Sequence, residues 1–195
     1  MWRRLSTVVD AQQRQRAHPV ELSLHVIQSD DIDAISAPDG TLVLSEAFVR
    51  SRHLSDAQLA FVLAHEASHV LLEHERQALT AALALLPRNV PRSIADIFVE
   101  FGFNIAVLQL LEPVMHQAEF EADELGLQLA ALAGYEPAQQ LLFMEAEADA
   151  EAPPVAVVST HPTAKNRLAR LQAQLPLAQR VFDYGQRQQP AERTR

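Results

Sequence analysis

Apolar and polar residues alternate with a period of two only in the first quarter of the chain. In residues 20–27, VELSLHVI, every second position is apolar, which predicts a β-strand. Two short apolar runs then flank Pro38-Asp39-Gly40, a turn sequence, so a β-hairpin is predicted around it. Residues 3–16, which are rich in Gln and Arg, predict a polar helix ahead of the strand.

From residue 55 onwards the apolar positions follow helical spacing instead. Ser55 and Gln58 have the spacing of a capping box, which predicts the start of a long helix that continues to Leu86 and stops at Pro87. Further helices are predicted over residues 92–112, 114–133, 137–148 and 162–175, with prolines or a glycine at several of their ends. A small early sheet followed by helices predicts an α+β fold that is mostly helical.

Length and composition limit the domain count and the function classes. A chain of 195 residues predicts a single domain, here residues 1–181, followed by a disordered polar tail at 182–195. The net charge of −9 argues against nucleic acid or an anionic membrane surface as the main partner. The start of the chain lacks the apolar core of a signal peptide, and no apolar run is long enough for a transmembrane helix. The compartment therefore stays open.

The absence of cysteine restricts any metal site to His, Asp and Glu. Within FVLAHEASHVLLEHE, His65 and His69 are four residues apart and lie on one helix face, where both imidazoles can bind one ion. Glu66 follows the first histidine and can act as a general base on a water there. The sequence thus predicts a zinc hydrolase; a buried helix that carries histidines by chance is the alternative.

A third ligand has to come from elsewhere in the chain. His74 lies nine residues after His65, on the opposite face of an unbroken helix, and is predicted to be a surface residue or an indirect contact. Glu119 and Asp123 have the same i, i+4 spacing on a later helix, as expected for a ligand carboxylate and a carboxylate that orients a ligand imidazole. An acidic, solvated helix face explains the same residues equally well.

Three motifs in this order, LAHEASHVLLEH, EFEADELGL and STHPTAKNRL, resemble the zinc peptidase family that includes the CAAX-prenyl endopeptidase and the HtpX heat-shock protease. The likeness is greatest to the mitochondrial inner-membrane stress protease and its bacterial relatives. It extends over residues 30–172 and takes in the hairpin DAISAPDGTLVLSEAFV. The resemblance implies a zincin-like domain in which the small sheet packs on a helical bundle that carries the HExxH helix. It also suggests a place in the cell envelope or beside a membrane.

The resemblance implies a ligand set of His65, His69 and Glu119 for one zinc ion per chain. It makes Glu66 the catalytic base and Asp123 the residue that orients a ligand histidine. Glu121 would then be a bystander.

The resemblance implies roles for two more residues, both in the last motif. His161 would assist catalysis at the oxyanion or block the open coordination site in a latent form. Arg167 matches the arginine of the same motif.

These residues predict a zinc endopeptidase that acts on extended or misfolded polypeptides, with a role in protein quality control. An extended substrate is expected to pair with the strand Thr41–Ser45 as an exposed edge. The alternatives are a latent metal-binding chaperone or assembly factor that holds extended chains without cutting, and a structural domain with inert histidines. The apolar stripe of helix 92–112 favours a core or site-covering role over membrane contact or dimerisation.

Overall fold

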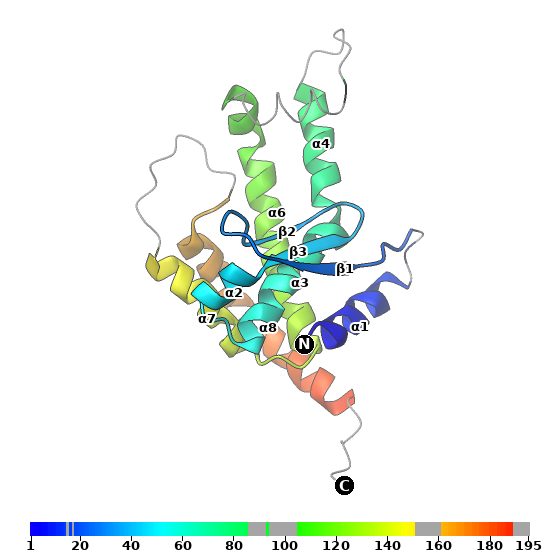
Figure 1. Ribbon diagram of the computed structural model, residues 1–195, viewed down its shortest axis with the longest axis vertical. Helices are drawn as coiled ribbons and strands as arrows, with labels where there is room; N and C mark the ends of the chain where they lie inside the picture. The colour runs from blue at the N-terminus through cyan, green and yellow to red at the C-terminus, as the bar shows by residue number, and fades with distance from the viewer. Residues whose placement is uncertain (15, 17, 86–92, 94–104, 151–160, 189–195) are drawn as a thin grey trace.

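The computed structural model describes the chain apart from residues 15, 17, 86–92, 94–104, 151–160 and 189–195 (Figure 1). In chain order its elements are α1 (Trp2–Gln13), β1 (Ser23–Ile27), β2 (Ala34–Ser36), β3 (Thr41–Ser45), α2 (Glu46–Ser51), α3 (Asp56–Leu72), α4 (His74–Leu85), α6 (Ile105–Leu132), α7 (Pro137–Ala150) and α8 (Ala164–Gln188). The predicted α+β class, with a small early sheet and many helices, is confirmed.

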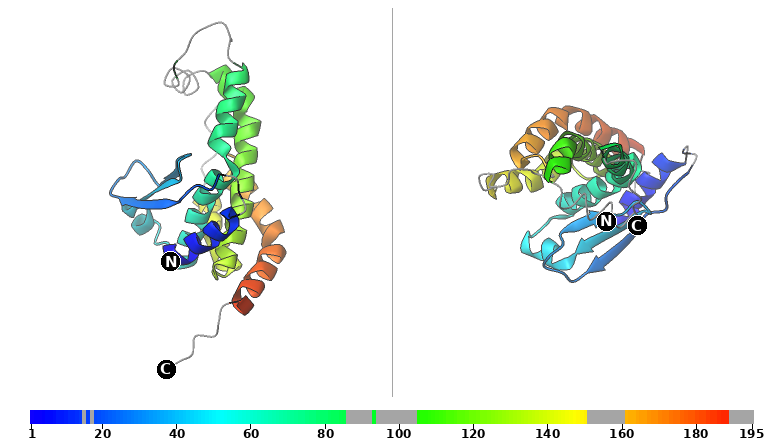
Figure 2. Two further views of the ribbon diagram at one scale, coloured as in Figure 1. Left: turned by 90° about the vertical axis from the view of Figure 1, so that its right-hand side faces the viewer. Right: turned by 90° about the horizontal axis from the view of Figure 1, so that it is seen from above.

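The sheet has three strands in the order β1-β3-β2 and lies on one side of the helices (Figure 2). β2 and β3 form the predicted antiparallel hairpin, whose turn includes Gly40 at a φ of 92°. β1 pairs in parallel with the other side of β3. Thr41–Ser45 is therefore the central strand, and its prediction as an exposed edge is wrong because both of its sides already carry backbone hydrogen bonds. Among the described strands, β2 is the edge next to α3.

Helix α3 runs between the sheet and the other helices and is buried on most of its faces. The predicted capping box starts it: the Ser55 hydroxyl accepts from the Gln58 amide, and the Gln58 side chain accepts from the Ser55 amide at 2.8 Å. Leu63 and Ala67 pack with the inner face of the sheet and α1, whereas Phe61 packs with α6, α7 and α8. Burial on two sides holds α3 rigidly in place, which suits an element that carries a site.

Three predicted helix boundaries are wrong. The helix predicted over 55–86 is divided at Glu73, which adopts the left-handed conformation with a φ of 56° and caps α3. Pro113 lies inside α6, and Pro176 lies inside α8, so neither proline ends its helix. A proline in a helix interior costs about 3 kcal/mol, and the packing of α6 and α8 on their neighbours outweighs that cost.

The C-terminal prediction is corrected in part. Residues 182–188, predicted as disordered, form the last turns of α8, where Gly185 is buried against Leu132 of α6. Residues 189–195 lie outside the described residues. So do most of the helix predicted over 92–112 and most of the segment between the helices predicted over 137–148 and 162–175. Of the helix predicted over 92–112, the residues from Ile105 onwards belong to α6.

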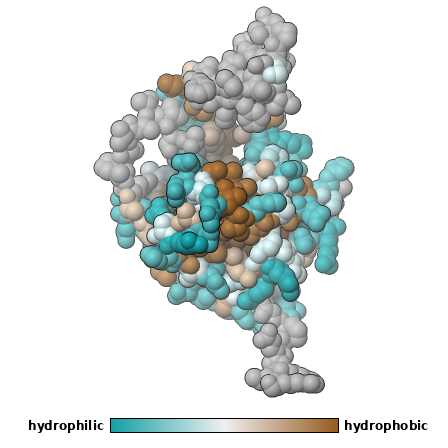
Figure 3. Space-filling model, viewed as in Figure 1, coloured by the Kyte–Doolittle hydropathy of each residue, from teal (hydrophilic) through white to brown (hydrophobic). Residues whose placement is uncertain are grey.

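The face shown in Figure 3 has an apolar area near its centre. The exposed large apolar residues of the strands are Val26 and Ile35, at 62% and 48%. α4 and the first half of α6 extend side by side away from the body of the molecule (Figure 1). In the described part of the chain, no helix has the length and apolar character needed to cross a membrane.

Candidate metal centre

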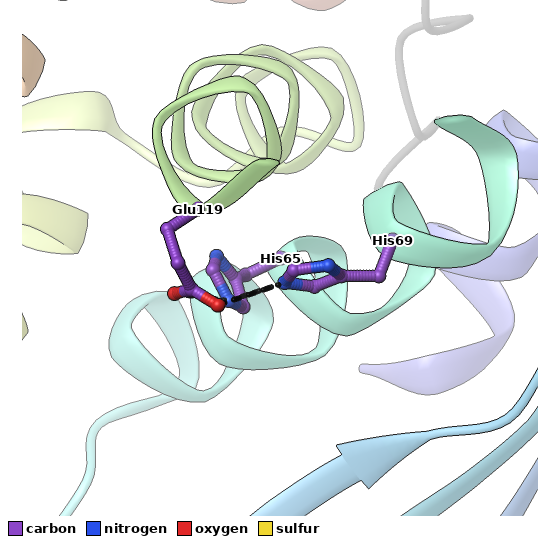
Figure 4. A group of neighbouring side chains, drawn as sticks. All are labelled: His65, His69 and Glu119. Atoms are coloured by element: carbon purple, nitrogen blue, oxygen red, sulfur yellow. Dashed lines mark hydrogen bonds and ion pairs between the residues drawn. The ribbon is translucent and has the colours of Figure 1, made fainter. Parts of the chain in front are cut away.

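Two helices that are distant in sequence bring His65, His69 and Glu119 to one point. The histidines lie one turn apart on α3, and Glu119 reaches toward them from α6 (Figure 4). The two imidazole Nε2 atoms are 3.1 Å apart. Glu119 Oε2 lies 3.6 Å from His65 Nε2, and Glu119 Oε1 lies 3.5 Å from His69 Nε2. These three residues form a group able to hold a metal ion.

The separations fit a zinc ion. Tetrahedral ligands at about 2.0–2.1 Å from zinc lie about 3.3–3.4 Å from one another, close to the three separations above. Glu119 is 6% exposed. Within the described part of the chain its Oε2 makes no hydrogen bond, although Arg167 Nη1 lies 3.2 Å away as an ion-pair partner. A buried carboxylate oxygen that makes no hydrogen bond keeps lone pairs that a cation can bind.

Asp123 holds the first histidine of the site. Its Oδ1 lies 3.0 Å from His65 Nδ1, so the imidazole donates there and its Nε2 lone pair faces His69 and Glu119. Burial lowers the pKa of His65, but the hydrogen bond and charge of Asp123 outweigh it and raise the pKa above its usual value. Asp123 is 1% exposed and Glu119 is nearly as buried, so the alternative of an acidic, solvated face is wrong.

Arg167 of α8 neutralises both carboxylates. Its Nε and Nη2 each donate to Asp123 at 2.7 Å, and its Nη1 faces Glu119. Burial raises the pKa of Glu119, but the hydrogen bond from His161 and the charges of His65 and Arg167 outweigh it, and the pKa falls to about 2. Glu119 is therefore ionised, as a metal ligand must be.

The second histidine is held by His74 and, through it, by Glu121. An indirect contact was one of the two predicted placements of His74, whereas the prediction of Glu121 as a bystander is wrong. His69 Nδ1 lies 3.0 Å from the Nδ1 of His74, and His74 Nε2 lies 3.4 Å from Glu121 Oε2. The prediction that places His74 on the opposite helix face is wrong because the helix breaks at Glu73. No glycine marks that break, so periodicity alone had no signal for it. Burial first, and then the charge of His65, lower the pKa of His69 to about 3.

Glu66 lies beside the candidate ligands and lines the same cleft. Burial raises its pKa, with neighbouring carboxylates adding to the effect, while His65 and a hydrogen bond with Ser36 of β2 act in the opposite direction. A carboxyl with a raised pKa is suited to accept a proton and then to release it. Ser36 is a second residue that sequence patterns did not identify as part of the site.

His161 lies at the rim of the site. Its Nδ1 is 3.1 Å from Glu119 Oε1, and its side chain is 64% exposed. The predicted proximity to the ligand set is therefore present, through Glu119.

The site opens into a cleft of about 680 Å³. The edge strand β2 forms one wall, and the region of His161 and Arg167 contributes another. Phe143 and Met144 of α7 give the cleft an apolar part, and Glu147 pairs with Arg52 at 2.9 Å. A cleft with an edge strand and both apolar and charged walls can hold an extended peptide.

Two imidazoles and one carboxylate that open on a cleft are the donor set of catalytic zinc sites in hydrolases. Comparison with known proteins agrees with this class. The model of Peptidase family M48 matches residues 3–175, and the chain belongs to this metallopeptidase family. The resemblance noted from the three motifs is thereby confirmed, and membership implies a metal cofactor.

The chain is similar to several curated proteins. It is 32% identical over 161 residues to the mitochondrial metalloendopeptidase OMA1 of Schizosaccharomyces pombe, covering 80% of this chain and 47% of that protein. It is 28% identical over 169 residues to the β-barrel assembly-enhancing protease of Escherichia coli K12, covering 78% and 34%. With the metalloendopeptidase OMA1 of Bos taurus the identity is 30% over 182 residues, covering 81% and 33%. The chain thus spans less than half the length of each of these relatives.

Proposed function

We propose that this chain is a zinc-dependent endopeptidase that cleaves extended or misfolded polypeptides, with a role in protein quality control. The observation that carries the proposal is the convergence of His65, His69 and Glu119 beside Glu66 in an open cleft. Membership of a peptidase family supports it. The names of the three relatives, two mitochondrial and one concerned with β-barrel assembly, favour a place near a membrane or in the cell envelope.

In this proposal His65, His69 and Glu119 hold one zinc ion in a zincin-like arrangement. The ion supplies Lewis acidity toward the scissile carbonyl and toward water. Asp123 keeps the Nδ1 proton on His65, so that its Nε2 lone pair stays available. Arg167 holds Asp123 in position and balances the charge of the two carboxylates.

Glu66 moves the proton in the reaction. It takes a proton from the attacking water as the new C–O bond forms, and it gives that proton to the leaving nitrogen as the C–N bond breaks. A raised pKa suits it to both steps. His161 donates an N–H to the carbonyl oxygen as negative charge develops there, which its exposed position at the rim allows.

The substrate is bound as an added strand. β2 is the edge strand that lines the cleft, and Ser36 on it contacts Glu66. An extended peptide paired with the backbone of β2 would run past the ligand set, whereas a compact domain has no free strand to offer. The preference for extended chains follows from this geometry.

The test is cleavage of a reduced, carboxymethylated protein by the wild type and by Glu66→Gln, with the native form of the same substrate alongside. We expect about one zinc per chain in both proteins, cleavage of the unfolded substrate by the wild type alone, and little cleavage of the native form. The matched control is Glu21→Gln, an exposed glutamate that does not line the cleft, which should cleave as the wild type does. Equal cleavage by wild type and Glu66→Gln would refute the role of Glu66. Binding of the unfolded chain without cleavage by either would favour the latent chaperone instead.

A further inference from the structure

A continuous line of side chains runs from His69 away from the cleft. His69 Nδ1 contacts His74 Nδ1 at 3.0 Å, and His74 Nε2 contacts Glu121 Oε2 at 3.4 Å. The His74 side chain is only 3% exposed, and the two imidazole rings meet edge to face with centroids 4.9 Å apart. Glu121 is held in turn by Gln117, whose Nε2 donates to Glu121 Oε1 at 2.7 Å.

The carboxylate at the end of this line determines where the protons lie. An ionised carboxylate only accepts hydrogen bonds, so His74 Nε2 must carry the proton that Glu121 accepts. In a neutral imidazole the other nitrogen is then bare, and His74 Nδ1 becomes an acceptor. The only donor that faces it in this contact is His69 Nδ1, which therefore carries a proton and leaves the Nε2 of His69 as a lone pair.

We propose that His74 is a positioning residue for the metal ligand His69, acting through a relay in which Glu121 sets the tautomer of His74 and His74 sets that of His69. The proposal rests on the metal site of the proposed function. It gives the two ligand histidines matching supports: His65 donates directly to Asp123, whereas His69 donates to a second imidazole that a carboxylate orients. Both Nε2 lone pairs are thereby directed to the same point.

The break in the helix is what makes this contact possible. On an unbroken helix His74 would face away from His69, but Glu73 in the left-handed conformation restarts the chain as α4 in a new direction. α4 then packs along α6, which carries Glu121. The left-handed conformation of Glu73 therefore does more than end α3, because it places the His74 imidazole against His69.

The experiment measures the zinc dissociation constant of the full chain by competition with a chromophoric chelator. His74→Phe keeps a ring and removes both nitrogens, and we expect it to weaken zinc binding by about 10- to 100-fold, the usual effect of losing an orienting partner. His74→Asn places an acceptor oxygen where Nδ1 was, and it should restore most of the affinity. Glu121→Leu leaves the His74 tautomer free and should weaken binding by a smaller factor. His25→Phe, an exposed histidine on β1, is the matched control and should bind as the wild type does.

Wild-type affinity in His74→Phe would overturn the proposal, and so would a His74→Asn variant as weak as His74→Phe, since packing and not the acceptor would then matter. If His74→Phe does not fold, Glu121→Leu provides the test, because the Glu121 side chain is 42% exposed and its replacement should leave the fold intact. Unchanged zinc affinity in Glu121→Leu would then overturn the relay. A wild-type protein that binds no zinc at all would instead refute the metal site of the proposed function, and the relay with it.

Discussion

Arg167 holds both carboxylate oxygens of Asp123, with its Nε and Nη2 each at 2.7 Å. The Asp123 side chain is 2% exposed and that of Arg167 is 16% exposed, so the pair is nearly sealed from water. Through Asp123 the same pair fixes the His65 imidazole. A contact between α6 and α8 thus determines how a residue on α3 presents its nitrogen to the candidate metal site.

Arg167→Met should lower the free energy of unfolding of the metal-free protein by about 3–5 kcal/mol, because removing one partner leaves a buried charge uncompensated. Urea unfolding followed by circular dichroism measures this. Arg180→Met, a change of the same kind further along α8, is the control. A loss of unfolding free energy no larger than that of the control would show that the Arg167 guanidinium does not stabilise the buried charge of Asp123.

Acid should weaken the metal-free protein through His69. Its pKa is about 3 in the folded state against an ordinary value of 6.5, so below pH 6.5 the unfolded chain binds a proton that the folded chain does not. Stability that is present above pH 6.5 is therefore lost progressively as the pH falls toward the folded pKa. His65, whose pKa is raised, contributes in the opposite sense and loses its stabilising effect as the pH rises through its folded pKa.

The measurement is the urea midpoint of chelator-treated protein between pH 6.5 and 5.5, which lies above the ordinary pKa of 4.5 at which Glu119 takes up a proton in the unfolded chain. His69→Gln should flatten the decline in that window. A slope identical to that of the wild type would mean that His69 titrates normally in the fold.

Gly126→Ala should destabilise the protein although alanine is the better helix former. A Cβ at this position of α6 would lie 2.9 Å from the backbone nitrogen of His65 and 3.0 Å from its Cα. Unlike the end of a side chain, these backbone atoms cannot relieve the contact by rotating. Moving α6 away from α3 by that contact costs about 1–3 kcal/mol, and it shifts Glu119 relative to the histidines. Unfolding free energy and zinc affinity should therefore fall together, whereas Gln128→Ala on the same helix should change neither. A stabilised Gly126→Ala protein would contradict the close approach of the two helices.

His161→Ala should lower kcat by about 10²- to 10³-fold, as expected when one donor to a developing oxyanion is lost. Zinc content and KM should stay close to the wild-type values, since His161 is not one of the three candidate ligands and the interaction it supplies strengthens only as the oxyanion forms. Steady-state kinetics on a quenched fluorescent peptide, with the metal content of each sample measured, gives both numbers. A faster variant would identify His161 as a blocking residue of a latent form.

The sequence predicted those parts of the fold and site that depend on local spacing. The hairpin at Gly40 follows from its turn residues, and the start of α3 follows from its capping box. The pairs His65–His69 and Glu119–Asp123 both follow from a spacing of four on a helix, and the structure brings them together.

Features that depend on tertiary packing were not predictable in this way. The order of the strands made β2 the edge, because β1 joins β3 from a distance in sequence. Pro113 remains within α6 because packing offsets its local cost. The left-handed residue that ends α3 is Glu73 and not a glycine, so the sequence has no signal for the break in the helix. The place of His74 beside His69 therefore could not be predicted from periodicity.

The central claim is that α3 and α6 together hold one divalent ion, and anomalous diffraction at the zinc edge from crystals grown with zinc tests it most directly. The account predicts one strong peak per chain, about 2.0–2.2 Å from His65 Nε2, His69 Nε2 and a Glu119 oxygen, and its loss in Glu119→Ala. A map without a peak between these three side chains, or a peak bound to the histidines while Glu119 stays apart, would contradict it.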